Sequence, residues 1–119
     1  MNFLHAPVFI ALLAGTSLVN AACEAPEMPS APDGSTASMD DMIAGQQAVK
    51  AFQAANTDYL SCIDSDMAAK KAAALEGNGA AKADYEAATD AYNTAVANEE
   101  AVAGAFNSAI RAYKAANPQ

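Results

Sequence analysis

Few side chains in this 119-residue chain are of the kinds that perform acid–base, nucleophilic or metal chemistry. His5 is the only histidine, and Cys23 and Cys62 are the only cysteines. The sequence has no phosphate-binding loop and no dinucleotide fingerprint. A chain that loses His5 with a leader segment has no Ser-His-Asp or Cys-His arrangement and no histidine-ligated zinc. We therefore predict that the protein is not an enzyme and uses no cofactor.

Acidic residues dominate the charge, with 14 Asp and Glu against 6 Lys and Arg and a net charge of −8. Affinity for nucleic-acid phosphates comes from clustered Lys and Arg, so a nucleic-acid partner is excluded. The densest acidic group is Asp58, Asp64 and Asp66. It lacks the glycine and bidentate glutamate of a calcium loop, which favours a solvated acidic face. A metal or small-ligand site at these three residues is the alternative.

The first twenty-one residues predict a secretory signal peptide. Residues 3–19 form an apolar run without charge, and Val19-Asn20-Ala21 ends it with small residues at the positions that a signal peptidase reads. We expect a periplasmic or secreted mature protein, from which His5 has been removed. An uncleaved anchor and a lipid on Cys23 are the alternatives, and membrane attachment is expected only in those two cases.

Residues 22–37 predict an extended proline-rich arm. Pro26, Pro29 and Pro32 recur every third residue, which matches the three residues per turn of polyproline II. The prolines should therefore share one edge of the arm. Asp33-Gly34 then predicts a turn.

Residues 38–117 predict an antiparallel two-helix hairpin of all-α class. Ser38 is a favoured N-cap for a helix running to about Leu75, and a second helix is expected over 80–116. The break at 76–79 contains two glycines beside an asparagine, which suits the end of a helix. Two long helices joined by so short a break must lie side by side.

Bulky residues in both helices recur at heptad spacing, which indicates a coiled-coil-like seam. In the first helix, the expected seam residues are Met42, Val49, Phe52, Tyr59 and Ile63. In the second helix, one expected row is Tyr85, Tyr92, Phe106 and Tyr113, and the neighbouring row is Val96, Val102 and Ile110.

With the turn centred near 77–78, residue i faces about residue 155 − i. This arithmetic places Asn56 opposite Glu99, so the polar interruptions of the two rows coincide. We interpret the pair as a polar layer that sets the register, because buried polar groups are costly unless they bond to each other. A ligand or ion site at this layer is the alternative.

Export makes a disulfide between Cys23 and Cys62 the expected state of the two thiols. The helix from Ser38 to Cys62 is ~36 Å long, and the arm from Cys23 to Ala37 reaches ~43 Å as polyproline II. The arm can therefore run back antiparallel along the first helix to Cys62. We expect it to lie in a groove of small side chains formed by Ala48, Ala55 and Ala69.

Several short motifs resemble a group of small exported proteobacterial helical proteins of unknown function. The shared features are a Pro-Asp-Gly-x-x-Ala-Ser stretch at 32–38 and a Tyr-x-x-Cys at 59–62, with further similarity at 92–96 and 105–114. The resemblance implies a location in the Gram-negative cell envelope and carries no assigned activity.

We therefore expect a non-enzymatic structural or protein-interaction module. Leu60 and Met67 on one helix, and Val96 and Ile110 on the other, flank the seam and suit an unknown protein partner or a homodimer of four helices. The alternative is a periplasmic protein that binds a small ligand or metal at the Asn56/Glu99 layer or the Asp58/Asp64/Asp66 face.

Overall fold

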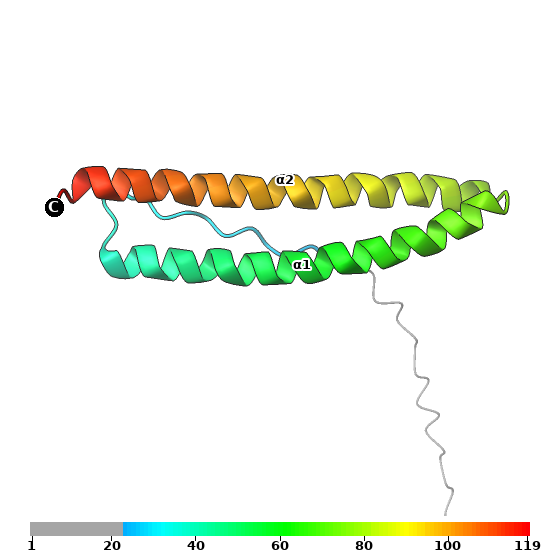
Figure 1. Cartoon of the computed structure of the whole chain (residues 1–119), viewed down its shortest axis with the longest axis horizontal. Coiled ribbons are helices and arrows are strands. Elements are labelled where there is room, and N and C mark those ends of the chain that lie inside the picture. The colour runs from blue at the N-terminus through cyan, green and yellow to red at the C-terminus, as the bar shows by residue number, and fades with distance from the viewer. Residues whose placement is uncertain (1–22) are drawn as a thin grey trace, which may run out of the picture.

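A computed structural model describes residues 23–119, so the predicted signal peptide lies outside the described residues. Helix α1 spans Met39–Leu75 and helix α2 spans Gly79–Ala116, and they lie antiparallel along their whole length (Figure 1). No strand occurs within 23–119. The predicted all-α hairpin is confirmed, with the second helix beginning one residue earlier than expected.

Helix α1 begins with a capping box. The Asp41 backbone N–H donates to Ser38 Oγ at 3.1 Å, and the Ser38 N–H donates to Asp41 Oδ2 at 2.9 Å. These two bonds satisfy backbone donors that the first turn of a helix otherwise leaves unpaired. Both hydrogen bonds with Ser38 lower the pKa of Asp41, and the bond from the Ser38 backbone has the larger effect.

The turn between the helices is a Schellman motif. Gly77 has φ 87°, a conformation that suits glycine, and its N–H donates to the Ala74 carbonyl at 3.1 Å. The Asn78 N–H donates to the Ala73 carbonyl at 3.3 Å. The Asn78 side chain then caps α2 by accepting from the Ala81 N–H at 3.2 Å. One asparagine thus ends the first helix and starts the second.

Of the bulky residues predicted in one row of α2, only Phe106 is buried, and a row of small residues occupies the contact line. This row of small residues repeats every seven residues as Ala81, Ala88, Ala95, Val102 and Ala109. Of the row predicted from Val96, Val102 and Ile110, only Val102 is buried, and Val96 is 38% exposed. Small side chains allow two helix backbones to approach, so the alanines occupy the contact line and Tyr85, Tyr92 and Tyr113 lie half-buried beside it.

The facing row of α1 is bulkier and agrees with the heptad prediction. Its buried members are Met42, Phe52, Asn56 and Ile63. Met42 and Phe106 belong to one apolar cluster, against which Val49 and Tyr113 pack. The cluster thus brings together the members of two pairs that the 155 − i register predicts, Met42 with Tyr113 and Val49 with Phe106.

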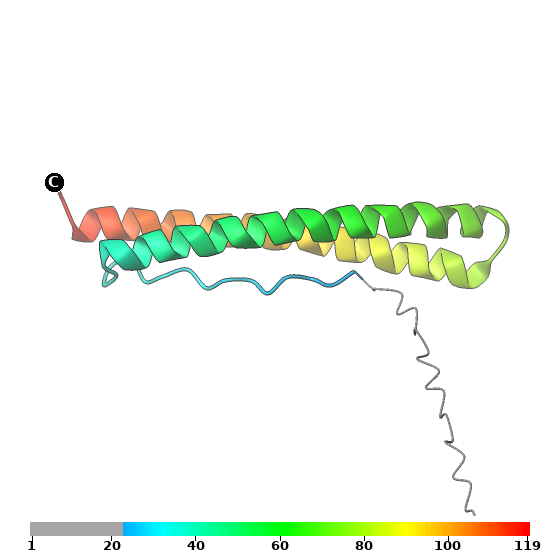
Figure 2. The ribbon, with the colours of Figure 1, turned by 90° about the horizontal axis from the view of Figure 1, so that it is seen from below.

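Residues 23–37 form the arm, an extended segment that runs back along the hairpin (Figure 2). Cys23, Pro26, Pro29 and Pro32 are half-buried, whereas residues 24, 25, 27, 28 and 30 are exposed. The three-residue period of polyproline II therefore turns one edge of the arm toward the helices, as predicted.

The arm lies between the two helices, which differs from the groove on α1 that we expected. Of the three alanines expected to form its bed, Ala48 is half-buried and lines the same hollow as Pro32, but Ala55 and Ala69 are exposed. Instead, a Cβ built on Gly45 would lie 3.0 Å from Pro32 Cδ and 3.1 Å from a ring carbon of Phe106, which comes from α2. The groove between two helices is deeper than the groove over one row of alanines on a single helix. The arm therefore buries more of its proline edge between the helices.

The Asp33-Gly34 turn docks on the backbone of α2. Asp33 Oδ1 accepts from the Ser35 backbone N–H at 3.0 Å and from Ser35 Oγ at 2.6 Å, and these bonds, the side-chain one foremost, lower the pKa of Asp33. Gly34 is buried, and a Cβ there would collide with the Ala109 carbonyl oxygen. Gly34 is therefore required by the close approach of two backbones.

We expect Gly34→Ala to lower the free energy of unfolding by about 2 kcal/mol or more, because the methyl group has no space against α2. Gly104→Ala is the matched control, since nothing lies within 4 Å of a Cβ at Gly104 and alanine favours a helix by about 1 kcal/mol. Urea unfolding followed by circular dichroism measures both. Equal stability of the two variants would place the arm away from α2.

Candidate functional site

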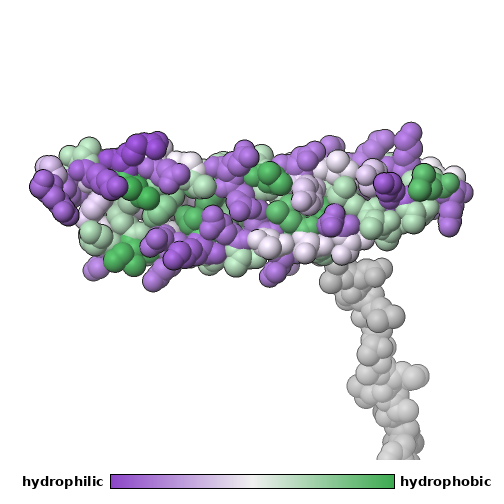
Figure 3. Space-filling model, viewed as in Figure 1, coloured by the Kyte–Doolittle hydropathy of each residue, from purple (hydrophilic) through white to green (hydrophobic). Residues whose placement is uncertain are grey.

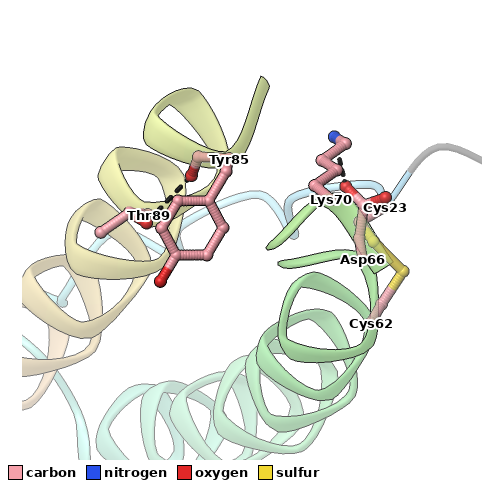
Figure 4. Close-up of polar contacts among 6 residues, drawn as sticks. All are labelled: Cys23, Cys62, Asp66, Lys70, Tyr85 and Thr89. Atoms are coloured by element: carbon pink, nitrogen blue, oxygen red, sulfur yellow. Dashed lines mark hydrogen bonds and ion pairs between the residues drawn. A yellow bond between two sulfur atoms is a disulfide. The ribbon is translucent and has the colours of Figure 1, made fainter. Parts of the chain in front are cut away.

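The disulfide joins Cys23 at the start of the arm to Cys62 in the middle of α1, as predicted (Figure 4). The Cα atoms are 5.7 Å apart, and the bond closes a loop with a sequence separation of 39. Loop-closure entropy for such a loop corresponds to about 4 kcal/mol of stabilisation. This term is large for a hairpin whose contact line is mostly alanine, because small domains have little apolar area to bury.

Removal of the disulfide should therefore be costly. We expect Cys23→Ala/Cys62→Ala to lower the free energy of unfolding by about 4 kcal/mol, measured by urea unfolding. Reduced wild-type protein should unfold at the same urea concentration as the double variant. Unchanged stability in both would mean that the arm stays docked by its own contacts and that the bond adds nothing.

An ion pair lies one turn beyond the disulfide on α1. Lys70 Nζ donates to Asp66 Oδ2 at 2.6 Å, and this hydrogen bond raises the pKa of Lys70 (Figure 4). On the neighbouring helix, Thr89 Oγ1 donates to the Tyr85 carbonyl at 2.9 Å. Both contacts are local, so neither forms a binding constellation.

Asn56 is the most buried polar residue of the described chain, with 1% of its surface exposed. Its Nδ2 donates to Glu99 Oε2 at 3.0 Å and to the Ala95 carbonyl at 3.2 Å. The two residues thus face each other, as the 155 − i arithmetic predicts. Within 23–119, no buried side-chain nitrogen or oxygen lacks a hydrogen-bond partner. The buried polar atoms of the layer are thus satisfied within the hairpin, and its role in setting the register stays a prediction.

A double-mutant cycle tests the register role. Asn56→Leu alone should cost about 2 kcal/mol, because it leaves the half-buried Glu99 carboxylate without its hydrogen-bond partner. Asn56→Leu/Glu99→Leu should be at least as stable as the wild type, because apolar side chains replace a polar pair without desolvation. A lower urea m-value in the double variant would report the loss of a unique register. If the separate changes in stability of Asn56→Leu and Glu99→Leu add up to that of the double variant, the coupling is contradicted.

The three aspartates that the sequence grouped do not converge. Asp58 and Asp64 are exposed, and Asp66 is paired with Lys70. At ~100° per residue, Asp58 and Asp64 point to different sides of α1. No group of three His, Cys, Asp or Glu side chains in the described part of the chain is placed to hold a metal ion. The aspartates therefore provide no ligand set in this arrangement.

An apolar groove lies at the open end of the hairpin. It has a volume of about 540 Å³, and its lining includes Met39, Ile43, Phe106, Ile110 and Tyr113. Met39 is 54% exposed and Ile43 is 45% exposed. Large apolar side chains exposed together mark interaction surfaces more often than isolated ones do. No arm residue lines this groove.

Of these lining residues, Ile110 is one that we expected to flank the seam and suit a partner, whereas Met39 and Ile43 were not among the residues that we predicted. Met39 lies 21 residues, or three heptads, before Leu60. It therefore belongs to the same heptad row as Leu60 and Met67, and that spacing could have identified it. Ile43 lies one row farther out, where the heptad pattern predicts solvent. Its place in the groove follows from the splayed open end of the two helices.

The groove belongs to one of two unlike faces of the hairpin. The arm lies behind the helices in the view of Figure 1, so the opposite face is the one seen in Figure 3. Figure 3 shows apolar side chains there, separated by hydrophilic ones. We call this the arm-free face. Beyond the groove, the face includes Leu60 and Met67 on α1, which lie in the heptad row of Met39. On α2 it includes Val96, which lies in the heptad row of Ile110.

Comparison with protein-family models, with curated proteins and with solved structures finds no match to this chain. Neither α1 nor α2 has the length and apolar character needed to cross a membrane. The function proposed below therefore rests on the surface of the hairpin itself.

Proposed function

We propose that this protein is an exported, non-enzymatic interaction module of the cell envelope, in which the arm braces a helical hairpin and the arm-free face binds a protein partner. The observation that carries the proposal is the groove lined by Met39, Ile43 and Ile110. It leaves large apolar side chains in water, and contact with a partner protein removes them from it.

Two features support export to an oxidising compartment. The Cys23–Cys62 disulfide persists only where thiols are not kept reduced. The apolar segment at residues 3–19 and the small residues that follow have the form of a secretory signal. The resemblance to small exported proteobacterial proteins agrees with a periplasmic location.

The division into two faces supports an interaction role. On one side, the arm occupies the seam, and Pro26 and Ala25 lie beside residues of both helices. On the other side, the equivalent seam has no cover and carries Val96 at 38% exposure. A module with one braced face and one open face presents a single defined docking surface.

Site-specific photocrosslinking in cells tests the proposal. A photoreactive residue at Ile43 should crosslink to another polypeptide, whereas the same residue at Ala97, which is exposed on the far side of α2, should not. The exported chain should also begin at Ala22 and lack two hydrogens by non-reducing mass spectrometry.

Five results would contradict the proposal. Equal crosslinking at Ile43 and Ala97 would mean that the groove has no special role, and no crosslinking at Ile43 would remove the interaction role. Residues 1–21 retained on the chain, free thiols or a diacylglycerol on Cys23 would overturn the export route and the brace.

A further inference from the structure

We propose that the partner of the arm-free face is a second copy of this chain, which packs face to face to make a four-helix bundle with both arms on the outside. This inference rests on the proposed function and names the occupant of its docking surface. It comes from the distribution of charge between the two faces, from the register of the helices and from the area of the face.

The face that carries the arm is strongly acidic. Seven carboxylates lie on the arm or on the helix rows beside it, namely Glu24, Glu27, Asp33, Asp41, Asp58, Asp66 and Asp84, against one base, Lys70, which is paired with Asp66. Two copies that met through this face would therefore bring together a net charge of about −12. Like charges across an interface are unfavourable, so the arm face is unsuited to self-association.

The arm-free face is nearly neutral. Helical spacing from the groove residues Ile43, Ile110 and Lys114 places on it four of the six basic residues of the chain, namely Lys50, Lys71, Lys82 and Lys114. The same rows carry only three acids, which are Asp64, Glu86 and Glu100. A protein with a net charge of −8 can therefore meet another copy of itself here without strong repulsion.

The register supplies matching pairs. In a dimer with its two-fold axis parallel to the helices, α1 of each copy packs against α2 of the other, and residue i again lies level with about residue 155 − i. Leu60 then meets Val96 of the second copy, and Ile43 lies level with the stretch from Ile110 to Lys114. Lys71 lies level with residue 84, within about one half-turn of Glu86.

Each of these contacts occurs twice, because a two-fold interface is self-complementary. Leu60 and Val96 join apolar to apolar, and Lys71 and Glu86 join opposite charges. Within residues 23–119 of a single chain, the one ion pair formed is that between Lys70 and Asp66, so Lys71 and Glu86 are free to pair across the interface.

The face is also large enough. A helix of 37 residues is about 55 Å long and about 10 Å wide, so two helices side by side present a plane of about 1,100 Å². A stable protein–protein interface buries about 800 Å² on each partner. An interface that uses the whole face therefore has enough area for a stable dimer, whereas an interface confined to the groove does not.

Sedimentation equilibrium of the purified, oxidised protein tests the inference, at concentrations from about 1 μM to about 1 mM, which spans the weak and moderate affinities of such interfaces. We expect the mass to rise with concentration to that of two chains. Val96→Glu should raise the dissociation constant at least about tenfold, because it places an unpaired charge in two apolar contacts. Ala97→Glu, at the neighbouring exposed position, should leave it within about twofold.

A charge swap tests the register. Lys71→Glu should weaken the dimer several-fold, and Lys71→Glu/Glu86→Lys should restore it, because the double variant rebuilds the pair with reversed sign. Circular dichroism of each variant confirms that the exposed substitutions leave the hairpin folded. Failure of the double variant to recover affinity would overturn the proposed two-fold arrangement.

The remaining outcomes separate this inference from the proposed function. A single-chain mass at every concentration, or equal weakening by Val96→Glu and Ala97→Glu, overturns the dimer. If Ile43 still crosslinks to a different protein in cells, the interaction role stands with another partner. If Ile43 crosslinks to nothing, both proposals fail.

Discussion

The structure depends on the arm that lies between the two helices and is tied to them by the Cys23–Cys62 bond. The contact line of α2 is mostly alanine, which brings the helices close but buries little apolar area per residue. A two-helix hairpin of this kind is marginal alone. The arm adds a third layer along one side of the seam, and the disulfide reduces the entropy of the unfolded chain.

The arm makes the hairpin two-sided. One side of the seam holds an extended segment whose prolines face inward at every third residue. The other side leaves Met39, Ile43 and Val96 partly in water. Charge follows the same division, with carboxylates gathered around the arm and most lysines on the open side. The difference between the faces comes from a segment with no regular secondary structure, and it leads us to place the interaction role on the open face.

We expect the polar layer at Asn56 to give the alanine seam a specific alignment. Alanine rows every seven residues fit against a partner helix in more than one register, because each alanine resembles the next. A buried asparagine that donates to both Glu99 and the Ala95 carbonyl is satisfied in one alignment only. The layer lies near the middle of the hairpin, where a single contact constrains both ends.

The sequence by itself determined the two helices, their capped ends, the turn at 76–79 and the Asn56–Glu99 pairing, because these features follow from local propensity and from heptad arithmetic. It also indicated the disulfide, because the arm length matches the helix length. Of the candidate site residues, Cys23, Cys62, Asn56 and Glu99 are brought together in pairs, whereas the aspartates at 58, 64 and 66 do not converge.

Only the tertiary structure decided which row of α2 is buried and where the arm lies. Both depend on how closely two helix backbones approach, and that distance is a property of the assembled pair. Ala95 and Tyr92 fit the heptad equally well, but only the alanine occupies the contact line. Gly34 likewise looks like an ordinary turn glycine in the sequence, and its contact with the Ala109 carbonyl exists because a distant helix passes beside it.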